Sequence, residues 1–110
     1  MELKYRAACR SDLDSLVYLL ANDPLGRLRE DSSECLNALY VSAFEAIDND
    51  PNNQLVVVEL SGQLVGMLQL IFIPYLTHIG SWRCLIEGVR MHENYRGNGF
   101  GEQMLNTQLI

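Results

Sequence analysis

The pattern of hydrophobic and polar positions predicts one strand and two helices in the first half of the chain. The short strand is expected at residues 4–8. Apolar residues then recur at helical spacing from Leu13, and Ser11 with Asp14 three residues later is a typical helix start. A second helix is predicted over residues 36–47, where one apolar face continues through several turns.

The second half of the chain is rich in strand-forming residues. Two β-rich runs, residues 54–60 and 63–73, are separated by Ser61 and Gly62, which suit a two-residue hairpin turn. A third run covers residues 82–92. Because these runs are almost continuously apolar, we expect both faces of the resulting sheet to be covered.

A glycine-rich segment follows the third run and carries the clearest binding chemistry of the chain. Gly97, Gly99 and Gly101 alternate with other residues and open a helix expected over residues 100–110. Glycine lets a backbone approach a ligand closely, and the free N–H groups of a helix start attract anions such as pyrophosphate. Two commoner phosphate sites are excluded, because Glu102 breaks the G-x-G-x-x-G pattern and no Gly-Lys-Ser/Thr is present. We therefore interpret this segment as a loop that binds a pyrophosphate, and the alternative is an ordinary glycine turn before a helix.

Length and charge narrow the class of protein. With 110 residues, of which 48% are hydrophobic, the chain is long enough for one globular domain, residues 1–110, and not for two. Residues 1–60 hold eleven acidic and five basic side chains, whereas residues 61–110 hold three of each. This acidic balance, without a basic stripe, argues against a nucleic acid partner. No membrane span or signal peptide is visible, so no membrane partner is expected and a cytoplasmic location follows by default.

The cysteine and histidine positions give no sign of a disulfide or a metal site. Cys9, Cys35 and Cys84 are odd in number, widely spaced and free of C-x-x-C pairing, which is typical of reduced thiols with a structural role. His78 and His92 are isolated from one another and from the cysteines. We therefore expect no metal ion in the chemistry of this chain.

The glycine segment matches one known signature, Arg/Gln-x-x-Gly-x-Gly/Ala, through Arg96, Gly97, Asn98, Gly99, Phe100 and Gly101. In this the chain resembles the GNAT N-acetyltransferases, which bind acetyl-coenzyme A (acetyl-CoA) through that signature. The predicted order of strand, two helices, three antiparallel strands, loop and helix is also similar to the N-terminal portion of the GNAT fold. The resemblance implies an α/β fold of the α+β type with a mixed sheet. The family fold continues with a fifth strand, a helix and two more strands, so we expect this chain to be C-terminally truncated.

The resemblance also implies which residues bind acetyl-CoA as acetyl donor. Backbone N–H groups of the signature would hold the pyrophosphate, and the Arg96 side chain would add positive charge. The backbones of Val89 and Met91 would pair with the pantetheine arm as a neighbouring strand does. A bulge beside them, which Gly88 allows, would leave one N–H to polarise the thioester carbonyl.

Glu87 is the candidate catalytic base. An acceptor amine is protonated at neutral pH and must lose a proton before it attacks. Glu87 interrupts an apolar run, where a poorly hydrated carboxylate accepts protons more readily; the alternative is a strand glutamate paired with Arg83 or Arg90. Many family members use a tyrosine beyond the pyrophosphate helix to protonate the departing thiolate, and no residue of this sequence inherits that role. Tyr95 is expected to be a packing residue, and Cys84 a buried strand thiol.

The resemblance places the acceptor site beside two loops, residues 23–31 and 75–78. A small amine is the first expectation for the acceptor, and a peptide N-terminus or lysine the second. The exposed edge of the fourth strand is expected to pair with another chain, giving a homodimer or strand exchange. The sequence thus predicts an N-acetyltransferase. The alternative is a catalytically impaired acyl-CoA-binding module or a self-associating fragment of such an enzyme.

Overall fold

The computed structural model describes residues 2–33, 35–97 and 99. Its elements follow one another in the order β1 (Lys4–Ala7), η1 (Arg10–Asp12), α1 (Leu13–Ala21), α2 (Gly26–Arg29), α3 (Ala38–Asp48), β2 (Asn53–Leu60), β3 (Gln63–Pro74), α4 (Thr77–Gly80), β4 (Trp82–Met91) and η2 (Glu93–Tyr95). The strands form one antiparallel sheet in the order β1-β2-β3-β4. Among these helices, none is long and apolar enough to cross a membrane. The helix expected over residues 100–110 lies outside the described residues.

Local sequence signals fix several of the turns and caps. Ser61 and Gly62 have φ values of 51° and 80°, as a type I′ hairpin turn requires, so the predicted hairpin between β2 and β3 is confirmed. The second main helix, α3, begins slightly later than expected. Asn37 caps it, because its side chain accepts a hydrogen bond from the Leu39 N–H at 2.9 Å.

The expected start of the first helix is wrong. The chain enters a helical turn at Arg10, so Cys9 and not Ser11 holds the cap position, and the carboxylate of Asp12 accepts the Cys9 N–H at 2.8 Å. The reason is a partner distant from the helix itself. Arg6 on β1 donates to both carboxylate oxygens of Asp12, at 2.8 and 3.0 Å, and holds that side chain inward.

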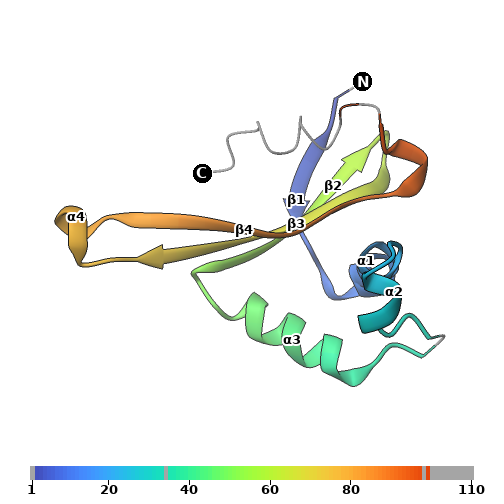
Figure 1. The fold of residues 1–110 in the computed structure, drawn as a ribbon, viewed down its shortest axis with the longest axis horizontal. Helices are drawn as coiled ribbons and strands as arrows, with labels where there is room; N and C mark the ends of the chain where they lie inside the picture. Colours follow the sequence, from blue (N-terminus) through green and yellow to red (C-terminus); the bar gives the residue numbers. More distant parts are fainter. Residues whose placement is uncertain (1, 34, 98, 100–110) are drawn as a thin grey trace.

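Both faces of the central sheet are buried. Figure 1 shows α1, α2 and α3 on the same side of the sheet. The core on the helix side contains Ala8, Leu13, Leu16, Leu19, Phe44, Val57 and Met67. The core on the opposite side contains Leu3, Val56, Val58, Leu60, Val65, Leu68, Leu70 and Met91. The expectation of two covered faces is therefore confirmed for the centre of the sheet.

The same expectation is wrong for the outer part of the β3–β4 hairpin, which extends beyond the helices as an arm (Figure 1). Trp82 on this arm is 60% exposed, and Ile79 at its tip is fully exposed. Cys84 is exposed as well, so the expected buried thiol is a surface one. An apolar pattern predicts that a segment is a strand but not that both of its faces are buried, because burial depends on which other elements pack against the strand.

Candidate functional site

The fourth strand carries a bulge at the predicted place. Arg90 of β4 faces Met67 of β3, and Glu87 faces Gln69, so that two residues of β4 lie opposite a single residue of β3. Gly88 lies in this interval with a φ of 60°, which glycine adopts without steric cost. This confirms the expected β-bulge, a feature that bends a strand and redirects its backbone groups.

Beyond the bulge, β4 presents backbone groups at a free edge. In the sheet that the described residues form, β4 is an outer strand. The N–H of His92, which follows the strand, donates to the Val65 carbonyl of β3 at 2.7 Å. Because backbone polar groups alternate between the two edges of a strand, those of Met91 and Val89 face the edge away from β3.

Two arginines cover carbonyl groups at this edge. Arg90 Nη1 donates to the Val89 carbonyl at 2.9 Å, and Arg96 Nε donates to the Met91 carbonyl at 3.1 Å. The oxygens of Val89 and Met91 therefore have donors already. What the edge offers to a ligand is chiefly the N–H groups of the same two residues.

Glu87 does not lie in apolar surroundings. Its side chain is exposed on β4, next to the bulge and opposite Gln69. The alternative pairing also fails within the part of the chain that the structure describes, where Arg90 pairs with Asp23 and Arg83 lies 4.7 Å over the ring of Tyr75. Glu87 is thus a solvent-facing carboxylate beside the bulge.

The glycine loop begins as the sequence predicts. Gly97 and Gly99 have φ values of 81° and 76°, so both occupy the left-handed region that favours glycine. The other predicted binding residues of the loop, Asn98, Phe100 and Gly101, lie outside the described residues. Tyr95 just before the loop packs against the sheet core, as expected.

The chain immediately before the glycine loop is held against the end of α1, which sequence reasoning missed. Arg96 Nη2 donates to the Asn22 carbonyl at 2.7 Å. The Tyr18 hydroxyl donates to Glu93 Oε1 at 2.6 Å, which raises the Tyr18 pKa above its usual value. The Tyr18 ring also stacks on His92 with centroids 5.8 Å apart. No local pattern in the sequence points to these pairs, because their members lie far apart along the chain.

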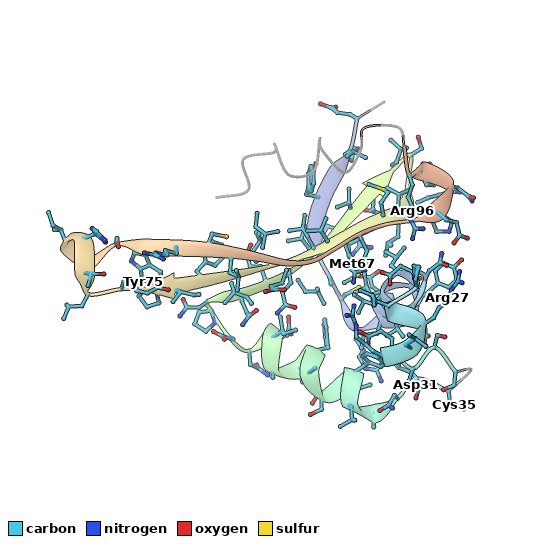
Figure 2. All side chains as sticks on the ribbon, in the orientation of Figure 1. Arg27, Asp31, Cys35, Met67, Tyr75 and Arg96 are labelled. Carbon is cyan, nitrogen blue, oxygen red and sulfur yellow. The ribbon has the colours of Figure 1, made fainter. Side chains whose placement is uncertain are left out.

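The two loops expected to border the acceptor occupy different places. Asp23, in the loop after α1, lies with Oδ2 3.1 Å from Arg90 Nε and so sits beside the bulge. The pKa of Asp23 is lowered, first by the Gly26 N–H that donates to its carboxylate and then by Arg90. Tyr75 lies at the other end of the β3–β4 hairpin from Arg96 (Figure 2). Of the two loops, only the first therefore reaches the bulge, through Asp23.

Of two hollows on the part of the chain that the structure describes, one lies away from the bulge and the glycine loop and the other lies beside the entry to that loop. One of about 620 Å³ lies between α3 and the β1–β2 edge and is lined by none of the predicted site residues. Another, of about 410 Å³, is lined by Tyr18, Leu19, Leu64 and His92 on the α1 side of the loop entry. No group of three or more His, Cys, Asp or Glu side chains that could hold a metal ion occurs among the described residues.

Comparison with known proteins identifies the class to which this arrangement belongs. A family model described as the acetyltransferase (GNAT) family matches residues 17–109. The chain therefore belongs to the GNAT acetyltransferase family, as its signature predicts.

Solved structures agree with this assignment. A transcriptional regulator from Bacillus halodurans C-125 is 47% identical, with a TM-score of 0.87 over 94% of this chain and 69% of its own. A putative acetyltransferase from Agrobacterium tumefaciens C58 is 26% identical, with a TM-score of 0.75 over 93% of this chain and 67% of its own. A predicted acetyltransferase from Clostridium acetobutylicum, solved with acetyl-CoA, shares the fold at 19% identity, with a TM-score of 0.67 over 96% of this chain and 70% of its own.

Proposed function

We propose that this chain transfers the acetyl group of acetyl-CoA to a primary amine by direct attack. The observation that carries this proposal is the bulge at Gly88, on the free edge of β4 and directly before the glycine loop. A linear thioester with a pyrophosphate at its far end needs an extended edge and an anion site in line with one another. The bulge, the edge and the loop follow one another along the chain in that order.

The coenzyme would be held mainly by backbone donors. The carbonyl groups of Val89 and Met91 already accept hydrogen bonds from arginines, so the N–H groups of the same two residues are what this edge offers. These N–H groups suit the amide carbonyls of pantetheine and the thioester oxygen, which are hydrogen-bond acceptors. A donor aimed at the thioester oxygen stabilises the negative charge that develops there during attack. Left-handed Gly97 and Gly99 leave the backbone of the loop accessible to the pyrophosphate.

Glu87 would remove the proton of the acceptor amine. Its carboxylate is exposed beside the bulge, so it can receive the proton through a water molecule as well as directly. Loop residues 23–31 would border the acceptor, since Asp23 is tied to β4 at Arg90. A small amine is the first candidate acceptor, and a peptide N-terminus or lysine the second.

Coenzyme binding without turnover is the second candidate function. The relative from Bacillus halodurans, 47% identical, carries the name transcriptional regulator and not the name of an enzyme. A sensor of acetyl-CoA would use the same edge and loop, and would have no need of Glu87 as a base. The two functions therefore differ in whether free coenzyme A is produced.

The free edge also supports the proposal of a homodimer. Leu85 and Ile86 on the outer part of β4 are 44% and 43% exposed, next to unpaired backbone groups in the sheet that the structure describes. Exposed apolar edges of this kind pair with other strands. Light scattering during size-exclusion chromatography would show a dimer that Ile86→Lys converts to monomer. A monomer before substitution would contradict this proposal.

The first test is a calorimetric titration of acetyl-CoA into the chain and two glycine variants. Gly99→Trp should abolish binding, because an indole would fill the space in front of the loop. Gly62→Trp is the matched control, since Gly62 has a similar φ of 80° and open space around it but lies in the β2–β3 turn. Equal loss in both variants, or no binding by the unmodified chain, would refute the coenzyme site.

Turnover is tested by measuring coenzyme A release with a panel of amines. Glu87→Gln should lower kcat by about 10²-fold or more while the affinity for acetyl-CoA stays the same. Tight binding without release for any amine favours the sensor function. An unchanged kcat in Glu87→Gln would remove Glu87 from the mechanism and leave the coenzyme site intact.

A further inference from the structure

The end of α1 and the segment that leads into the glycine loop are joined by three side-chain contacts. These are Tyr18 to Glu93 at 2.6 Å, Asp23 to Arg90 at 3.1 Å and Arg96 to the Asn22 carbonyl at 2.7 Å. We refer to this set as the α1–β4 clamp. Figure 2 shows Arg96 at the end of β4 that lies near α1 and α2. The clamp binds the loop entry to a helix that belongs to the buried core.

Arg96 differs from the other members because it joins two backbone carbonyls. Its Nε donates to Met91 at 3.1 Å, and its Nη2 donates to Asn22 at 2.7 Å. These two nitrogens form one side of the planar guanidinium, so a single rigid fork connects the end of β4 with the end of α1. The Asn22 carbonyl is at the C-terminal end of α1, where the helix dipole also favours a cation.

We propose that Arg96 is a positioning residue of the coenzyme site. By joining the Met91 and Asn22 carbonyls, it sets the direction in which the backbone enters Gly97 and Gly99. It does not act through electrostatic attraction between its guanidinium and the pyrophosphate. This inference rests on the proposed function, because acetyl-CoA is the ligand that it assumes. The two hydrogen bonds of Arg96 are made without any ligand.

The fork explains why an arginine fits this position better than a lysine. A lysine keeps the positive charge but carries it on one nitrogen at the end of a flexible chain. That nitrogen cannot reproduce two parallel N–H groups on a fixed plane. A charge role and a positioning role therefore make opposite predictions for Arg96→Lys, which leaves the net charge unchanged.

The first readout is amide hydrogen exchange of the ligand-free chain. Arg96→Lys should accelerate exchange in residues 91–97 about tenfold, because bonds to a charged donor are lost. Exchange in β2, whose Val57 and Val58 are fully buried, should not change. Arg27→Lys is the matched control, since Arg27 carries the same charge on the neighbouring α2 and takes no part in the clamp.

The second readout is the affinity for acetyl-CoA. Positioning by Arg96 predicts that Arg96→Lys weakens binding about tenfold, while Arg27→Lys binds as the unmodified chain does. Unmodified affinity in Arg96→Lys would overturn the proposal. Unchanged exchange in residues 91–97 would overturn it too. If the unmodified chain binds no acetyl-CoA, the proposed function fails, and the exchange measurement still decides whether the fork orders the loop entry.

Discussion

Asp12 offers a test of how strongly one tertiary ion pair fixes the start of α1. The side chain is only 11% exposed, and both of its oxygens accept from Arg6. The Arg6 hydrogen bond lowers the pKa of Asp12 from 3.8 to about 2. One pKa unit corresponds to about 1.4 kcal/mol, so the ionised carboxylate contributes about 2 kcal/mol to the stability of the folded chain near neutral pH.

The pH dependence follows from the direction of that change. A carboxyl whose folded pKa is depressed stabilises the fold above its unfolded pKa, and the contribution disappears as the pH falls through the folded pKa. Asp12→Asn has the shape of the protonated side chain. We therefore expect it to be less stable than the unmodified chain by about 2 kcal/mol at pH 7, and almost equally stable near pH 2.

Urea unfolding followed by far-ultraviolet circular dichroism measures this difference. Tryptophan fluorescence is a poor probe here, because Trp82 is 60% exposed on the arm and away from the core. Asp14→Asn removes an exposed carboxylate from the same helix and should change stability by less than about 0.5 kcal/mol. If the loss in Asp12→Asn were the same near pH 2 as at pH 7, the assignment of its stability to the ionised pair would be refuted.

Three further substitutions test the site and its support. Gly88→Val forces a β-branched residue to a φ of 60°, so the bulge should be lost and calorimetry should show weaker acetyl-CoA binding with little change in circular dichroism. Gly26→Ala should destabilise the chain by about 1–3 kcal/mol in urea unfolding, because its Cβ would overlap the Leu20 carbonyl oxygen; a neutral result would contradict the close approach of α2 to α1. Tyr18→Phe removes the bond to Glu93 but keeps the ring on His92, and because Tyr18 is 44% exposed, urea unfolding should show only a small loss of stability.

Most of the fold could be predicted from the sequence because its signals are local. The β2–β3 turn follows from Ser61 and Gly62, whose conformations depend on their own backbone preferences. The positive φ values of Gly97 and Gly99 agree in the same way with what glycine permits. These features depend on residues adjacent in the chain, so no knowledge of the packing is needed to find them. The bulge, in contrast, is expected from the resemblance to the GNAT family, and Gly88 allows it.

The partners of charged side chains could not be predicted in this way. The sequence by itself determined the strands, the two main helices and the glycine signature, and with them the family. Only the tertiary structure decided that Arg96 bridges two carbonyls, that Asp12 turns inward to Arg6 and that Glu87 faces solvent. Burial and ion pairing depend on which distant segments meet, and a local pattern carries no information about a neighbour far away along the chain.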